Sequence, residues 1–280
     1  MREKCLLGVY EKAFPEDISI KEMLCEAKRA GFDFFEMSID RTEKRIGRLY
    51  DTSVIEMLSK DMETANIRIG SLALSAIGTY TLGNSEQKIA DKAIDIAKQA
   101  VVFAEKLGIR IVQIPACDMP KYDERSYVTH TNYVRRLREI VAFAAAHGVI
   151  LGLENMENDY MDTVEKCMQL VQSVDSPYLQ LYPDAGNIMS AALLYGTDPC
   201  IDMNKGKGHY LGFHLKETRP NKYGGLFFGE GHVDFVRLTK RAYELGVRRY
   251  VMEFWYNEMS NWKQDLQKAY LFFDATLNDS

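Results

Sequence analysis

The stretch that decides the fold is residues 97–116, which read AKQAVVFAEKLGIRIVQIPA. Its first part continues an apolar stripe that starts at Ile89 and recurs at steps of three and four residues up to Leu107, as on one face of a helix. Gly108 then permits the left-handed backbone that ends many helices. Residues 109–115 follow as a short and almost continuous apolar run, which is typical of a strand covered on both faces. The stretch therefore predicts a helix that leads directly into a buried parallel strand.

The same pattern of helix, glycine and strand recurs along the chain, for example around Gly31, Gly148 and Gly246. Eight strand candidates follow one another: residues 6–10, 34–39, 67–74, 109–115, 150–156, 179–184, 211–216 and 250–255. Eight βα units predict an α/β fold, a TIM (β/α)8 barrel, formed by residues 1–280 as a single domain. A doubly wound open sheet is the alternative, but no Gly-x-Gly-x-x-Gly motif follows the first strand.

Helix start signals agree with this order, with Asp51-Thr52-Ser53 and Asn84-Ser85-Glu86 opening two of the expected helices. The sixth unit is the weak one, because residues 198–208 offer only a short helical piece.

The composition argues against a surface that binds nucleic acids or anionic membranes. The net charge is −5 and the pI is near 5.7, whereas nucleic acids and anionic membranes require clustered positive charge. Five cysteines without a C-x-x-C pair suggest neither a disulfide framework nor a zinc ribbon. The first residues lack the long apolar region of a signal peptide, and no run approaches the length of a membrane span, so we expect a cytoplasmic protein.

Polar residues interrupt the apolar runs where the last four strands end. These residues are Glu154, Asp184, His214 and Glu253. In a barrel enzyme the chemistry lies at the carboxyl ends of the strands, and three carboxylates with one imidazole are costly to bury there without a cation. The sequence therefore predicts one divalent metal, with Mn²⁺, Mg²⁺, Co²⁺ and Zn²⁺ all compatible with these ligands. The alternative is that each is an ordinary polar strand end that caps a helix or pairs with a lysine.

At this point the chain resembles a known family over essentially its whole length. It is similar to the L-ribulose-5-phosphate (L-xylulose-5-phosphate) 3-epimerases of the xylose isomerase-like TIM barrel group, which have also been named hexulose-6-phosphate isomerases. The segments that carry the resemblance are GVYEKA at 8–13, GFDFFEMS at 31–38, LSA at 74–76, LYPDAGN at 181–187, HLKET at 214–218, FGEGHVDF at 228–235 and EFW at 253–255.

The resemblance implies an isomerase, specifically a metal-dependent carbohydrate epimerase with one divalent ion, Zn²⁺ or Mn²⁺ foremost. The metal ligands would be Glu154, Asp184, His214 and Glu253. Glu154 and Glu253 would also be the catalytic residues, one removing and one returning the proton at C3 of a ketose through a metal-bound enediolate. The expected substrate is L-ribulose or L-xylulose 5-phosphate.

Other residues near the strand ends are candidates for binding the sugar. We expect substrate contacts from Glu11, Lys12, Ser38, Asn187, Lys216 and Arg219, with Asp40 as a further candidate. Lys216 and Arg219 are the expected partners of a substrate phosphate, which favours charge-assisted donors.

One segment departs from the family. After Ser75-Ala76, the 3-epimerases carry a histidine and paired arginines, whereas this chain reads IGTYT at 77–81. This departure leaves two alternatives, a different phosphate contact or an unphosphorylated ketose as the substrate. An aldose–ketose isomerase of the hexulose-6-phosphate isomerase type uses similar chemistry and stays an alternative.

Two readings from other classes are weaker. A DNA-repair endonuclease of the same barrel group would need more histidines than the five present and a basic groove. A sugar-binding regulator would not need two carboxylates placed for proton transfer. We expect a homodimer, the commonest closed assembly.

Overall fold

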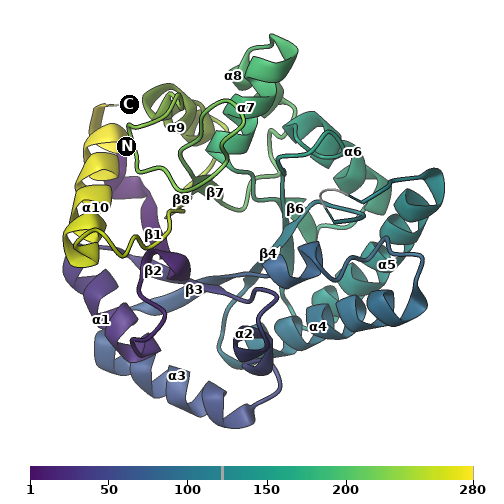
Figure 1. The fold of residues 1–280 in the computed structure, drawn as a ribbon, viewed down its shortest axis with the longest axis horizontal. Helices are drawn as coiled ribbons and strands as arrows, with labels where there is room; N and C mark the ends of the chain where they lie inside the picture. Colours follow the sequence, from purple (N-terminus) through teal and green to yellow (C-terminus); the bar gives the residue numbers. More distant parts are fainter. Residues whose placement is uncertain (121–122, 280) are drawn as a thin grey trace.

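The structure, a computed structural model, describes residues 1–120 and 123–279, and a barrel of parallel strands forms its centre (Figure 1). The eight strands are β1 (Leu6–Tyr10), β2 (Phe34–Ser38), β3 (Arg68–Ala73), β4 (Ile111–Pro115), β5 (Ile150–Glu154), β6 (Leu179–Leu181), β7 (Phe213–Leu215) and β8 (Arg249–Met252). They follow the order β6-β5-β4-β3-β2-β1-β8-β7. Parallel bridges between Leu181 and Tyr210 and between Asp184 and His214 join the two remaining edges. The predicted (β/α)8 barrel is confirmed.

The helices form a ring outside the strands (Figure 1). They are α1 (Ile20–Ala30), α2 (Glu43–Gly47), α3 (Thr52–Ala65), α4 (Gln87–Lys106), α5 (Tyr127–Ala146), α6 (Val164–Val174), α7 (Ala185–Tyr195), α8 (Pro199–Asn204), α9 (Phe235–Glu244) and α10 (Trp262–Asp279), with short 3-10 turns at Arg2–Lys4, Glu11–Ala13 and Ser75–Gly78. The four glycines predicted to end helices, Gly31, Gly108, Gly148 and Gly246, all have positive φ. Within the described residues, no helix is both long and apolar enough to cross a membrane.

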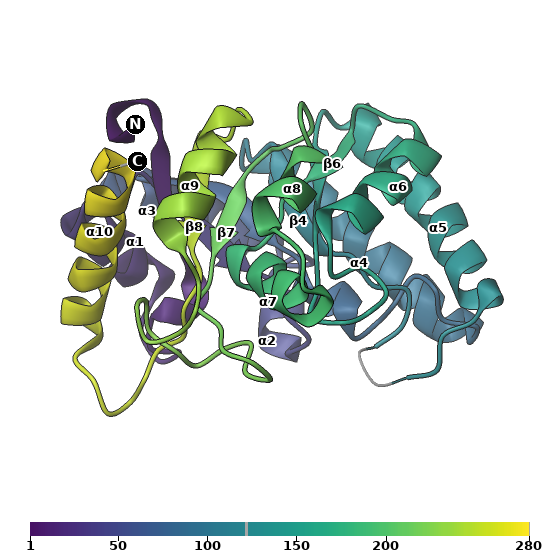
Figure 2. The ribbon, with the colours of Figure 1, turned by 90° about the horizontal axis from the view of Figure 1, so that it is seen from above.

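The loops that leave the carboxyl ends of the strands gather on one side of the barrel, the lower side in Figure 2, and the two termini lie on the other. Apolar side chains fill the space between strands and helices, while a second cluster packs inside the barrel itself. The inner cluster consists of Tyr10, Phe34, Ala73, Tyr182 and Val251. It closes the barrel below the strand ends, so polar side chains at those ends sit on an apolar floor.

The structure differs from the sequence prediction mainly in the sixth unit. Residues 185–195 form the helix α7, with Asp184 as its N-cap through a 2.7 Å bond from the Asn187 backbone N–H to Asp184 Oδ1. The segment is apolar on nearly all sides, so it lacks the polar face that marks an amphipathic helix. The strands β6 and β7 are also shorter than the apolar runs that contain them.

Candidate active site

Four side chains from four consecutive strands meet at the carboxyl end of the barrel. Glu154 ends β5, Asp184 follows β6, His214 lies within β7 and Glu253 follows β8. Each offers one ligand atom, and the four atoms all lie within 4.8 Å of one another. All four residues are buried. The structure thus brings together the residues that the strand ends singled out.

The oxygen atoms of this cluster fit a divalent cation. Asp184 Oδ2 and Glu253 Oε2 are buried and accept no hydrogen bond from any described residue. Buried carboxylate oxygens are costly to leave without a hydrogen bond, so two such atoms in one cluster leave room for a cation. Carboxylate oxygens and one imidazole nitrogen suit Mn²⁺, Mg²⁺, Co²⁺ and Zn²⁺. The residues present therefore match the metal that the sequence predicts.

Lys216 lies inside this cluster. Its Nζ is 3.3 Å from Asp184 Oδ1 and 4.0 Å from Glu253 Oε2, and the side chain is buried. Burial raises the pKa of the Asp184 carboxyl to about 7 against the attraction of Lys216. Burial opposes ionisation of Glu253 as well, but Lys216 and His214 outweigh it and lower the pKa of Glu253 to about 2. The two carboxyls therefore differ widely in their affinity for a proton.

The imidazole of His214 faces carboxylates on both sides. Its Nδ1 is 2.9 Å from Glu154 Oε1 and 3.2 Å from Glu253 Oε2, and its Nε2 is 2.6 Å from Glu36 Oε1. Burial lowers the pKa of His214, but these three acids together raise it well above the usual value. Nδ1 is thus the nitrogen that faces Glu154 and Glu253.

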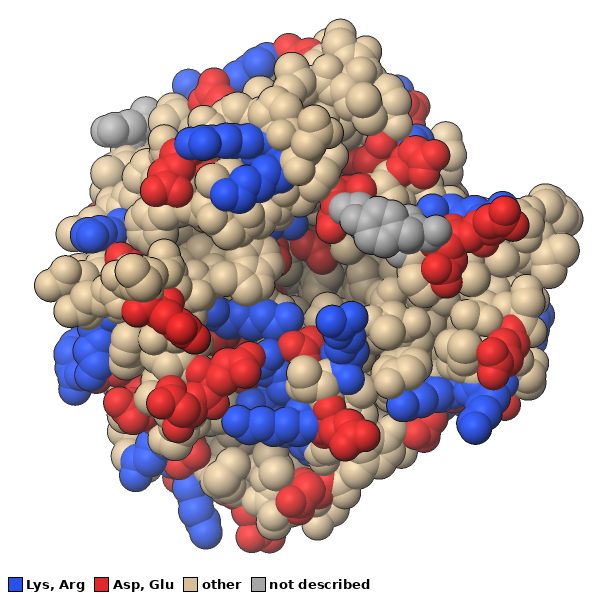
Figure 3. All heavy atoms as spheres, in the orientation of Figure 1, with Lys and Arg blue, Asp and Glu red and all other residues tan. Residues whose placement is uncertain are grey.

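A cavity of about 570 Å³ opens onto these residues, and its mouth is the hollow at the centre of the barrel in Figure 3, where acidic side chains are visible inside. Its described walls include Lys12 from the loop after β1, Gln113 from β4 and Trp255 from the loop after β8. Gln113 donates a 2.6 Å hydrogen bond from Nε2 to Glu154 Oε2, which orients that carboxylate. A cavity of this size accommodates a sugar of five or six carbons.

The six predicted substrate residues are placed differently from one another. Lys12 and Lys216 line the described wall of this cavity, whereas Glu11, Ser38, Asn187 and Arg219 are not among its lining residues. Lys12 Nζ forms an ion pair of 3.1 Å with Asp40. Lys216 is buried beside Asp184 and Glu253.

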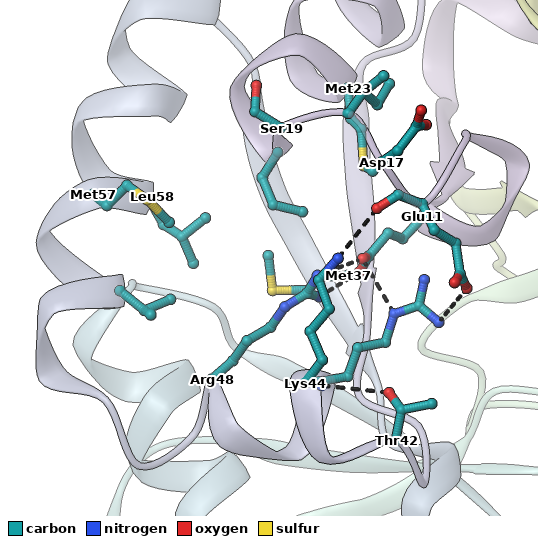
Figure 4. Close-up of a pocket in the computed structure, with 15 residues that line it drawn as sticks. Glu11, Asp17, Ser19, Met23, Met37, Thr42, Lys44, Arg48, Met57 and Leu58 are labelled. Atoms are coloured by element: carbon teal, nitrogen blue, oxygen red, sulfur yellow. Dashed lines mark hydrogen bonds and ion pairs between the residues drawn. The ribbon is translucent and has the colours of Figure 1, made fainter.

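Glu11 faces a second pocket, of about 700 Å³, outside the barrel between α1, α2 and α3 (Figure 4). There it is fully buried and receives Arg48 at 2.8 Å and Arg45 at 3.4 Å. Its Oε2 also accepts a 2.8 Å bond from the Ser38 backbone N–H. Ser38 Oγ lies 3.1 Å from the Tyr10 hydroxyl. Both residues therefore hold the ends of β1 and β2 together.

Asn187 and Arg219 are likewise engaged in local contacts. Asn187 Nδ2 donates a 2.7 Å bond to the Asn155 carbonyl, which ties the first turn of α7 to the end of β5. Arg219 is exposed and donates to the Glu230 carbonyl.

Two residues of the site escaped the sequence reading. Glu36 lies within β2 and Gln113 within β4; Glu36 contacts His214, and Gln113 bonds to Glu154. The available signal was a polar residue in the middle of an apolar strand, because an acid such as Glu36 is kept there only when it has partners.

Comparison with known proteins places the chain among sugar epimerases. It is 33% identical over 267 residues to L-ribulose-5-phosphate 3-epimerase UlaE of Salmonella paratyphi A, a match that covers 94% of this chain and 92% of the relative. The UlaE protein of an Escherichia coli strain is 32% identical over the same shares of the two chains.

Solved structures show the same fold at lower identity. An L-ribulose 3-epimerase superposes with a TM-score of 0.78 at 18% identity, covering 98% of this chain and 95% of the other. A D-allulose 3-epimerase from Methylomonas sp. gives a TM-score of 0.79 at 18% identity, covering 97% of each chain.

The curated relatives are epimerases, so the protein is an enzyme of the isomerase class. The model of one family, described as xylose isomerase-like TIM barrel, matches residues 24–275. Both findings agree with the barrel and with the cluster at its carboxyl end. The chain belongs to the xylose isomerase-like TIM barrel family.

Proposed function

We propose that the protein is a ketose 3-epimerase that works with one divalent metal held by Glu154, Asp184, His214 and Glu253. The observation that carries this proposal is the buried cluster in which Asp184 Oδ2 and Glu253 Oε2 accept no hydrogen bond from the described residues. The similarity to UlaE supports the reaction class. A bound Zn²⁺ or Mn²⁺ supplies Lewis-acid polarisation of the ketose carbonyl, which makes the neighbouring C–H bond more acidic.

The two glutamates are arranged for proton transfer on opposite sides of the substrate. Glu154 and Glu253 come from β5 and β8, the outer two of the four strands that carry the cluster. One carboxylate removes the proton from C3, and the electron pair of the broken C–H bond moves toward the carbonyl oxygen to give a planar enediolate. The other carboxyl group then delivers a proton to the opposite face, so C3 is inverted without net oxidation or reduction. The two residues exchange roles in the reverse direction.

Gln113 and Lys216 support this work. The hydrogen bond from Gln113 to Glu154 Oε2 fixes one oxygen, which leaves Oε1 on the side of His214. The Lys216 ammonium lowers the pKa of Glu253 against the effect of burial, which keeps that carboxylate able to accept a proton. Gln113 thus orients one base, and Lys216 keeps the other ionised.

The first substrates to test are L-ribulose 5-phosphate and L-xylulose 5-phosphate, because the similar UlaE proteins are named for the former. An unphosphorylated ketose is the second candidate, and one observation favours it. Among the described residues that line the cavity, the cations are Lys12 and Lys216, and each is already paired with an aspartate. Gly78 and Thr79, from the segment that departs from the 3-epimerases, line the wall without adding positive charge.

The deciding experiment uses purified protein loaded with Mn²⁺ or Zn²⁺ in D₂O, with a panel of ketoses and ketose 5-phosphates. Deuterium is located in the recovered sugars by NMR. Label at C3 with inversion is the expected result. Label at C1 or C2 with formation of an aldose would support an aldose–ketose isomerase instead. No exchange into any sugar of the panel by the metal-loaded protein would contradict both activities.

A further inference from the structure

We propose that Glu36 is a positioning residue, which keeps a proton of His214 on Nε2 so that Nδ1 is the nitrogen that binds the metal. The inference rests on the proposed function, because it assigns a role toward the metal. Glu36 is not itself within the ligand cluster. Its role is to determine which nitrogen of His214 is free to bind.

The contacts of Glu36 satisfy both of its oxygens. Oε1 lies 2.6 Å from His214 Nε2, while Oε2 accepts bonds of 2.7 Å from Ser71 Oγ and 3.1 Å from the Tyr182 hydroxyl. Glu36 is fully buried in the barrel interior. An acid in such a place is stable as an acceptor of several hydrogen bonds, and charge-assisted bonds of this kind are short and strong. The geometry therefore makes Glu36 an acceptor for the Nε2–H group.

The ring of His214 is also held from the side. The Tyr182 ring meets it edge-on with centroids 5.1 Å apart. Tyr182 itself fills space left by two glycines, since a Cβ on Gly152 would lie 2.8 Å from its Cβ and a Cβ on Gly212 2.5 Å from its ring. The aromatic packing and the bond to Glu36 together restrict rotation of the imidazole.

The consequence follows from the chemistry of imidazole. A neutral histidine carries one N–H group and one lone pair, and the partner of one nitrogen determines the role of the other. In the metal-free protein Nδ1 is protonated as well, since it lies 2.9 Å from Glu154 Oε1 and 3.2 Å from Glu253 Oε2. When a metal takes the place of that proton, Nε2–H stays on Glu36 and the lone pair that binds is the one on Nδ1. A carboxylate behind a histidine ligand also increases the basicity of that ligand.

The test measures Mn²⁺ affinity of the purified protein by the electron paramagnetic resonance signal of free Mn²⁺. Glu36→Gln keeps the size of the side chain but removes its negative charge, so Nε2–H meets at best a neutral amide oxygen, which is a weaker acceptor and no longer fixes the proton on Nε2. We expect Mn²⁺ to bind roughly 10- to 100-fold more weakly. At saturating Mn²⁺ we expect kcat to recover to within about tenfold of the parent value, because the proton-transferring groups are intact.

Ser71→Ala is the matched control, since it removes a donor from the other oxygen of Glu36 and leaves the contact with His214 in place. Its Mn²⁺ affinity is expected to stay within about threefold of the parent. A Glu36→Gln affinity equal to that of the parent overturns the positioning role while leaving the proposed function intact. Failure of the parent to bind Mn²⁺ overturns the metal-dependent function, and the positioning role with it.

A second measurement needs no variant and so does not depend on how Glu36→Gln folds. The ¹⁵N-labelled parent is loaded with Zn²⁺, and the ring nitrogens of His214 are assigned from long-range proton–nitrogen NMR spectra. The expected pattern is a protonated Nε2 and a metal-bound Nδ1. A protonated Nδ1 with the metal on Nε2 would refute the inference.

Discussion

Both halves of the barrel place polar residues at their strand ends, but these residues have different surroundings. After β1 and β2, Glu11 is paired with two arginines, and Asp40 with Lys12 and Arg45. After β6 and β8, Asp184 and Glu253 each keep an oxygen without a hydrogen-bond donor among the described residues. The first arrangement is a set of satisfied charges, and the second has capacity left for a ligand.

Whether a buried acid is fully paired indicates its role better than its residue type does. Glu11 and Glu253 are both buried glutamates in the loops that follow strands. Glu11 forms ion pairs with Arg45 and Arg48 from the α2 segment, which lies outside the barrel (Figure 4). Glu253 instead faces His214 and Lys216 inside it. Unsatisfied acceptors in a cavity are thus the better indication of a site.

The largest effect should come from Glu154→Gln and Glu253→Gln. Each change removes a proton-transferring group, so kcat should fall about 10³-fold or more. This loss is equivalent to an increase of roughly 4 kcal/mol in the activation free energy. Initial rates of ketose epimerisation at saturating Mn²⁺ measure it, with Mn²⁺ binding recorded for each variant. Glu230→Gln, in the exposed loop before α9, is the control and should keep the parent rate. A Glu154→Gln enzyme with near-parental kcat would remove Glu154 from the mechanism.

The second prediction concerns the half of the barrel around β1 and β2, where Glu11 is paired with arginines. Glu11→Gln leaves Arg48 without a buried counter-charge, while Arg45 keeps Asp40, so the free energy of unfolding should fall by about 3 kcal/mol. Chemical denaturation followed by circular dichroism measures this, and kcat per folded molecule should change less than about threefold. Glu16→Gln is the matched control, because Glu16 is exposed and 3.5 Å from Arg45, and it should cost under about 0.5 kcal/mol. A loss of kcat without a loss of stability would show that Glu11 acts on the substrate after all.

The sequence predicted which residues lie at the strand ends, but not which partners each of them contacts. Strand ends locate residues along the barrel axis, which is why Glu154 and Glu253 could be named. The side to which a loop residue turns depends on partners distant in sequence, such as Arg48 for Glu11, and no strand pattern contains that. Glu36 was missed for the same reason, since its partner His214 is 178 residues away.

The fold was easier to predict because its signals are local. A glycine with positive φ such as Gly108 ends a helix through its own backbone, and the amphipathic α4 displays its buried stripe directly in the sequence. The helix α7 has no polar face and was therefore not recognised.

The third prediction concerns the pH dependence of metal binding at Asp184. Metal ligands must be deprotonated, and in the metal-free protein burial raises the pKa of Asp184 to about 7. Protons therefore compete with the metal at Asp184 as pH falls through 7, and at His214, whose pKa is also raised. The apparent Kd for Mn²⁺ should rise at least about tenfold for each unit below 7, roughly 1.4 kcal/mol per unit for each proton displaced. Titrations between pH 6 and 8, with protein-free buffer as the control, test this. An apparent Kd that is flat over this range would contradict the raised pKa of Asp184.

The smallest effect concerns Lys12, the residue that connects the two halves. It pairs with Asp40 on one side and, on the other, lines the cavity that Glu154, His214 and Glu253 also line. Its side chain is partly exposed, so its charge is screened, and Lys12→Ala should raise KM about fivefold, near 1 kcal/mol, with kcat almost unchanged. KM is compared for matched pairs of ketose and ketose 5-phosphate. A larger increase for the phosphorylated sugar identifies Lys12 as a phosphate contact. Equal increases mean that it binds the sugar hydroxyls, and an unchanged KM for both means that Lys12 belongs with Glu11 to the paired half.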